Sequence, residues 1–468
     1  MTTALISQGV VEVVMLPDSQ EALVSQVVVE VIIPTTPPTQ ALVSQAVVEA
    51  VVLPDTQLAF VSQVVVEALI HPPISFFVPC LITIPTQGSI ASQYFVLLRD
   101  VDGNLIAVFD DWISLSFREI IKEVYEGTFT ISGLDARTTL FEEDGRVEIY
   151  RSVPGASILW YIECVLLIDG FVYDTAESGE RLFIVELVGL NDFLRRRDVA
   201  YRAGTIFSDK SGAADSVVQE YVNENTGIIA TTGNGRLEEG IIPNFSVAGA
   251  AGLAKIWRGS LSGQNLLSSI QDIAKFATID FAVIQSGDDS WVFTVYPNLI
   301  GNDRTVVGLN ASTGLNLAGN APVYFSVPFG TVATQNYRKS RRNEANTIIV
   351  WGNGERSTQK VTVRKDVTQR AITKYNKREL SVSGSNAEYT YQLEFIGDAE
   401  LEINKFEETF QMIPLQQVSN IYGKHYFLGD RVTVIDERTQ TQFTKRIIGV
   451  TFIIDGQTRN EQLTFEFE

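Results

Sequence analysis

The chain has 468 residues, of which 45% are hydrophobic and 20% are charged, and its formal net charge is −20. This composition supplies ample material for a core and excludes disorder as the state of the whole chain. An acidic balance of this size also excludes a protein that grips nucleic acid through an overall basic surface.

Cysteine and histidine are scarce, with two residues of each in the chain. Cys80 and Cys164 lie in apolar surroundings, which predicts buried free thiols and no disulfide framework. His71 and His425 are far from both, so the sequence predicts no metal site and no cofactor, and His425 is interpreted as structural or surface-exposed. No signal peptide and no membrane segment is predicted, so a soluble protein assembled in a cytoplasm is expected.

Residues 1–73 contain four near-copies of one Val-rich segment of the form Ser-Gln-x-Val-Val-Glu. Segments rich in Pro, Asp, Ser and Thr separate the copies and mark turns. Within a copy, one face of an extended strand is apolar except for serine, and the other alternates apolar and polar side chains. The sequence therefore predicts one strand of about ten residues in each copy.

The charges of this block restrict how its strands can pair. It holds seven acidic residues and no Lys or Arg, and the first Lys or Arg of the chain is Arg99. Parallel strands in register would align the glutamates, and directly opposed like charges are destabilising. Two alternatives follow: an antiparallel meander, or strands whose glutamates meet basic residues of another chain or domain.

We interpret the block as an arm that lies against a partner, with a self-contained small β domain as the alternative. A thin sheet of four short strands needs one apolar face covered to be stable. The candidate partner-contact residues are the Ser, Gln and Glu of each copy: Ser7, Gln8, Glu12, Ser25, Gln26, Glu30, Ser44, Gln45, Glu49, Ser62, Gln63 and Glu67.

After a connector at 74–91, strands dominate up to about residue 201. An Asp-Gly turn at Gly103 between two apolar segments predicts a hairpin. Further strands are predicted over 128–133, 146–153, 160–175 and from 181 onward. These short strands with tight turns are typical of a barrel or sandwich.

Two helices are predicted next, at 214–227 and within 263–281, because their apolar residues recur with helical spacing. A hairpin follows with its turn at Asp288, and the stretch 301–345 is rich in Gly, Asn and Ser and is predicted to be mostly loop. A buried strand near 348 and a final hairpin around Asp455 complete the chain. The predicted fold class is mainly β with a few helices.

The usual catalytic motifs are missing from the sequence. There is no phosphate-binding loop, and the stretch 233–240 does not have dinucleotide-binding spacing. Adjacent carboxylates on a strand point to opposite faces, so they do not form a paired acid–base site. No catalytic residue is therefore predicted, although four such pairs occur: Asp110/Asp111, Glu142/Glu143, Asp288/Asp289 and Glu407/Glu408.

From residue 92 onward the sequence resembles tail hub proteins of long-tailed bacteriophages. The segments that carry the resemblance occur in the same order: VLLRDVDGNLIAVFDDWISLSF, EGTFTISG, GLNDFLRRRDVAY, LSGQNLLSSIQDIAKFATIDFAVI, NYRKSRRNEANTIIVWGNGE and YFLGDRVTVID. Each segment alone is only weakly specific for this family, whereas the ordered set is more specific.

The resemblance implies two tail-tube-like β-barrels, at 92–205 and 331–468, with helix-containing mixed domains at 206–330 between them. It implies a homotrimeric collar at the tail tip that closes the distal tube, through whose lumen DNA passes without specific binding. Its implied partners are the distal tail ring, the tape measure protein, and tip or fibre proteins.

The alternatives are a tail-associated cell-wall glycan hydrolase and a receptor- or carbohydrate-binding tail protein. For the latter, five tryptophans could stack on sugars, although most lie in apolar strands. The two basic runs are interpreted as solvated charge or as candidate subunit-interface residues: Arg195, Arg196, Arg197, Arg338, Arg341 and Arg342.

Overall fold

The computed structural model describes the backbone of residues 8–15, 22–32, 43–52 and 59–68, and the chain from 92 to 468 except residues 157–159, 176–178, 206, 386, 388–389, 417–419 and 437–440. The chain divides into two compact units, Met1–Ser92 and Gln93–Glu468. The predicted connector, Cys80, His71 and Ser7 lie outside the described residues.

The first unit contains one antiparallel sheet whose strands follow chain order: β1 (Gln8–Met15), β2 (Ala22–Ile32), β3 (Val43–Val52) and β4 (Ala59–Ala68). The backbone thus adopts the antiparallel alternative. Glu12 is paired with Gln26, and Glu49 with Gln63. Among the paired positions of these four strands, no glutamate is opposite another glutamate.

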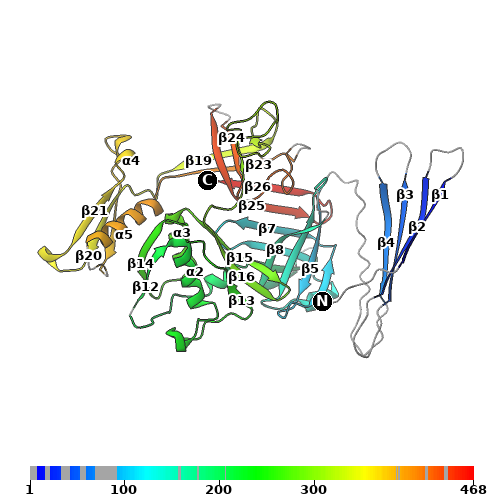
Figure 1. The fold of residues 1–468 in the computed structure, drawn as a ribbon, viewed down its shortest axis with the longest axis horizontal. Helices are drawn as coiled ribbons and strands as arrows, with labels where there is room; N and C mark the ends of the chain where they lie inside the picture. The colour runs from blue at the N-terminus through cyan, green and yellow to red at the C-terminus, as the bar shows by residue number, and fades with distance from the viewer. Residues whose placement is uncertain are drawn as a thin grey trace. The chain divides into compact units, whose positions relative to one another are not determined.

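The second unit is built on one 14-stranded sheet, drawn from cyan to red in Figure 1. Its main path runs β19-β23-β26-β25-β7-β8-β11-β10-β9-β5-β6, and β24 carries β17 and β18 beside β25. The strands from the first half of the chain are β5 (Gln93–Arg99), β6 (Leu105–Phe109), β7 (Ser114–Ile120), β8 (Glu126–Ser132), β9 (Arg146–Ser152), β10 (Tyr161–Thr175) and β11 (Arg181–Gly189).

Strands from the second half of the chain complete this sheet because β25 pairs with both β26 and β7. Strands of both expected barrel regions, 92–205 and 331–468, therefore share one sheet, and the described strands do not close into a barrel. The later strands are β17 (Asp303–Arg304), β18 (Tyr324–Phe325), β19 (Val332–Ser340), β23 (Glu407–Pro414), β24 (Arg431–Ile435), β25 (Gln442–Asp455) and β26 (Glu461–Phe467).

The hairpins expected at Asp-Gly turns are confirmed. Gly103 connects β5 to β6 with φ +83°, and a Cβ there would lie 2.2 Å from the carbonyl oxygen of Asp288. Only glycine suits this position, because the backbone is left-handed and a second turn packs directly against it. The final hairpin, β25 to β26, likewise turns after Asp455.

Both predicted helices are confirmed, as α2 (Ala214–Asn225) and α3 (Leu266–Ala277). The Asn265 side chain caps α3 by accepting a hydrogen bond from the backbone N–H of Ser268. These helices share a core with short strands and a small helix: α1 (Asp192–Arg195), β12 (Ser208–Ala213), β13 (Phe245–Val247), β14 (Ile256–Leu261), β15 (Asp280–Gly287) and β16 (Ser290–Tyr296).

A separate lobe, residues 345–403, lies between β19 and β23 in the sequence. We call it the β20 lobe. Its longest helix was not predicted, because only Leu393 and Gly397 are buried along it and the apolar stripe is narrow. The lobe contains β20 (Thr347–Gly352), β21 (Val361–Lys365), α4 (Val367–Ala371), β22 (Glu379–Gly384) and α5 (Thr390–Ile403).

A buried ionic network joins distant strands of the large sheet. Arg151 on β9 is fully buried, and its guanidinium binds Glu461 at the start of β26 with N–O distances of 2.8 to 3.0 Å. The same guanidinium contacts Glu163 on β10 at 3.0 Å, and the Tyr94 hydroxyl of β5 donates to Glu461. Because β9 and β26 are far apart along the sheet, the sheet must curl to bring these groups together.

A second buried ion pair attaches the mixed domain to the sheet. Arg446 on β25 binds the fully buried Asp280 at the start of β15, and Lys122 approaches the same carboxylate at 3.3 Å. The Asp280 carboxylate also accepts the backbone N–H of Ile300. The cations and the amide hydrogen bond offset the cost of burying the Asp280 carboxylate, so the pair can attach the mixed domain to the sheet.

Replacing Arg151 with alanine should lower the unfolding free energy by about 3–5 kcal/mol, because two buried carboxylates would lose their cation. Chemical denaturation followed by tryptophan fluorescence measures this change. Lys405→Ala breaks the exposed pair with Glu402 and should cost under about 1 kcal/mol. Equal losses in the two variants would contradict the assigned role of Arg151.

Candidate functional site

The structure places the predicted interface arginines on different elements. Arg195 and Arg196 both bind Asp192 of α1, and Arg196 also binds Asp144. Arg341 is held by Glu344 at 2.6 Å. Arg197 is only partly exposed, whereas Arg338 and Arg342 are exposed on β19 and just after it. The role of these six arginines at a subunit interface stays a prediction.

An acid-lined pocket of about 500 Å³ lies in the second unit. Glu119 at the end of β7 and Glu163 on β10 line it from the large sheet. Residues of β15, including Ile284, line the opposite side. Ile162 and Ile284, each 41% exposed, add apolar surface to its lining.

Glu119 is the unusual group of this acidic pocket. It is buried, and one of its carboxylate oxygens, Oε1, has no hydrogen-bond partner among the described residues. Burial, together with the nearby negative charge of Glu163, raises the pKa of Glu119 well above its ordinary value. Burial likewise raises the pKa of the neighbouring Cys164 thiol, a free buried cysteine as predicted.

Glu163 is instead tied into the Arg151 network. Its Oε2 accepts hydrogen bonds from the Arg151 guanidinium at 3.0 Å and from the Tyr161 hydroxyl at 2.9 Å. The pocket therefore combines one carboxyl whose pKa is raised with one carboxylate that is occupied by structural contacts.

The sequence did not predict that Glu119 and Glu163 lie close together, because the carboxylate pairs it offered were acids adjacent in the chain. The turn residue Asp288 lies 3.6 Å from Arg99 and also lines the pocket. Glu119 and Glu163 each interrupt an otherwise alternating apolar strand, and that interruption is the signal that was available. Their proximity depends on the curl of the sheet, which the sequence does not display.

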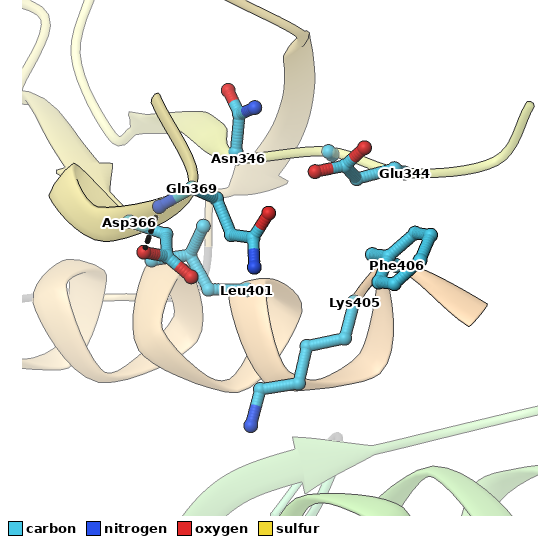
Figure 2. Close-up of a pocket in the computed structure, with 8 residues that line it drawn as sticks. Glu344, Asn346, Asp366, Gln369, Leu401, Lys405 and Phe406 are labelled. Carbon is cyan, nitrogen blue, oxygen red and sulfur yellow. Dashed lines mark hydrogen bonds between the residues drawn. The ribbon is translucent and has the colours of Figure 1, made fainter. Parts of the chain in front are cut away.

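A smaller pocket of about 110 Å³ lies in the β20 lobe, between the loop before β20 and the end of α5 (Figure 2). Its charged groups have partners within the chain. Asp366 caps α4 by accepting the backbone N–H of Gln369 at 3.0 Å, as the dashed line in Figure 2 marks. Glu344 binds Arg341, and Lys405 binds Glu402. These contacts indicate a structural pocket.

His425 is also structural. Its Nδ1 accepts the backbone N–H of Ile421 at 2.9 Å, and burial lowers its pKa. In the described ranges, no three His, Cys, Asp or Glu side chains are grouped as metal ligands would be. Nor does any helix there combine the length and apolarity that spanning a membrane requires.

Among solved structures, this chain is similar to tail proteins that share 9% to 12% of its sequence. The prophage MuSo2 43 kDa tail protein from Shewanella oneidensis is 12% identical, with a TM-score of 0.49 over 81% of this chain and 98% of that one. A tail protein from Neisseria meningitidis is 12% identical, with a TM-score of 0.45 over 80% and 96% of the two chains. No curated protein matches this chain.

The class is that of siphovirus proteins, in agreement with the sequence resemblance to a family of long-tailed bacteriophages. Residues 95–465 match one family model, and the chain belongs to the Siphovirus ReqiPepy6 Gp37-like protein family.

The raised pKa of Glu119 predicts a distinct pH dependence of stability. Between the ordinary glutamate value near 4.5 and the raised value, the native state holds a proton that the unfolded state releases, so stability falls as pH rises. Glu119→Gln stays neutral and should avoid this loss. Between pH 5 and pH 8 the unfolding free energy of this variant should therefore rise relative to that of the wild type.

Denaturant titrations at the two pH values measure this gain. The control is Glu186→Gln, at an exposed position on β11, which should follow the wild type at both. A Glu119→Gln variant that also followed the wild type would show that the native carboxyl titrates normally.

Proposed function

We propose that the protein is the hub of the tail tip, a homotrimeric collar that closes the distal end of the tail tube. Membership of the phage family and the β-rich fold support this role. The observation that carries it is the open sheet of the second unit. Its path ends at β6 and β19, and neither strand has a second neighbour in the described chain.

Open sheet edges favour pairing or packing with another chain. The two edges are different surfaces, so a contact between them on successive copies is heterologous and closes a ring when the rotation allows it. Exposed Arg338 and Lys339 lie on β19, which agrees with Arg338 as a candidate subunit-interface residue. Two tail-tube-like barrel domains completed by neighbouring copies are part of this proposal.

The collar would connect the tube to tip or fibre proteins, at the virion tail tip. Its further partners would be the distal tail ring and the tape measure protein, and DNA would pass through the lumen without specific binding. Residues 1–73 would serve as an arm through the Ser, Gln and Glu positions of each repeat, by packing or strand addition.

A mass measurement of the purified full chain tests the trimer. The expected mass is about 155 kDa, three times the 51.7 kDa of one chain. Light scattering after size exclusion, repeated over a hundredfold dilution, gives this mass directly. A chain that stays at 51.7 kDa even when mixed with its distal ring protein would contradict the hub.

A further inference from the structure

The β20 lobe has one covered sheet face and one bare one. On the covered face, Ile348 and Val350 of β20 pack against Leu393 of α5, and Figure 1 shows α5 lying along this sheet. The other side of α5 meets the mixed domain, where Phe395 contacts Phe276 of α3 at 5.2 Å between ring centroids. The helix therefore separates the lobe sheet from the rest of the unit, and the opposite sheet face points away from it.

The bare face is apolar across two strands. Trp351 of β20 is paired with Val361 of β21, and Ile349 with Val363. Trp351, Val361 and Val363 are 42%, 44% and 46% exposed. Apolar cross-strand pairs of this kind stabilise a sheet, and in a folded protein another layer of side chains normally packs over them. A contiguous exposed apolar patch on a sheet marks a surface that another protein covers.

The charge around the bare face is opposite to that of the whole chain. Residues 355–379, which include β21, α4 and the loop to β22, carry eight basic and three acidic residues in a chain of net charge −20. Three of the basic residues are paired within the chain: Arg364 with Asp398 of α5, Lys377 with Glu379, and Arg378 with Glu344. Lys365 is exposed at the end of β21, on the same strand face as Val363 and Val361. An apolar centre with a basic border suits an occupant that is apolar and acidic.

One segment of this chain has that chemistry. Residues 1–73 are rich in valine and contain seven acids with no Lys or Arg. Their four short strands form a thin sheet, and such a sheet needs a cover for its apolar face. Duplex DNA would satisfy the basic border but has no apolar face to set against Trp351 and the valines, so the protein occupant is favoured.

We propose that the bare face of the β20 lobe binds the acidic repeat segment, residues 1–73, of another copy of this chain. The inference rests on the proposed assembly of copies and names the surface through which the repeat arm acts. Apolar contact with Trp351, Val361 and Val363 holds the segment, and Lys365 and its basic neighbours outside those three ion pairs neutralise glutamates that have no Lys or Arg in their own segment.

Zero-length cross-linking of mixed copies tests the contact. Full chains labelled with light and heavy nitrogen are mixed before assembly, a carbodiimide couples carboxylates to lysines, and mass spectrometry identifies the joined peptides. The expected products join Lys365, or its neighbours Lys360 and Lys374, to acids of residues 1–73, with one peptide light and the other heavy.

Two substitutions at Val363 distinguish an effect of charge on binding from an effect on folding. Val363→Glu adds a negative charge to the bare face and should lower the mixed cross-links about tenfold, because like charges then meet across the contact. Val363→Lys removes the same apolar side chain but adds a positive charge. This variant should therefore retain more of the cross-links than Val363→Glu does. Leu317→Glu, at a site 86% exposed in a loop outside the lobe, should have no effect. Equal denaturant midpoints in all variants show that they fold alike.

The outcomes distinguish this inference from the proposed hub. A trimer of the expected mass that gives no cross-links from the lobe lysines to residues 1–73 overturns the inference and leaves the hub standing. Cross-links found only between peptides of the same label place the contact within one chain and also overturn it. If a DNA duplex instead protects Lys365 from acetylation and the cross-links are missing, nucleic acid is the occupant and the inference fails.

Discussion

The fold of the second unit depends on one buried arginine. Arg151 has no exposed surface, and its guanidinium is shared by Glu461 and Glu163. A buried carboxylate without a cation costs several kcal/mol, so these three groups must stay together in the native state. They come from β9, β10 and the start of β26, and a flat sheet would hold the first two far from the third. The ionic network therefore fixes the curl of the sheet.

The curl determines what the other parts of the unit can contact. It places the end of β7 near β10, which creates the acidic pocket and leaves Glu119 buried beside Glu163. The pair Arg446–Asp280 then attaches the mixed domain to the same sheet at β25. Two buried ion pairs, each joining segments more than a hundred residues apart in sequence, thus connect the sheet to itself and to the domain beside it. Ionic contacts of this kind specify one arrangement among many that would bury similar apolar area.

Local features of the fold were predictable from the sequence, because local chemistry determines them. The Asp-Gly hairpins follow from turn geometry, and α2 and α3 follow from wide apolar stripes with helical spacing. α5 was missed because little of its surface is buried. The shared sheet was missed because the pairing of β25 with β7 joins segments at opposite ends of the chain. No local pattern encodes such a pairing. The pocket carboxyls were missed for the same reason, since Glu119 and Glu163 approach each other only in the curled sheet.

The register of the repeat strands allows the number of copies to change. At each junction of the four-stranded sheet, a glutamate of one strand is opposite a glutamine of the next, as at Glu30 and Gln45. A duplicated copy would extend the meander by one strand and create the same Glu–Gln pairing at its new junction. Gene duplication or loss could therefore lengthen or shorten this segment in single steps, without ever placing two carboxylates opposite one another.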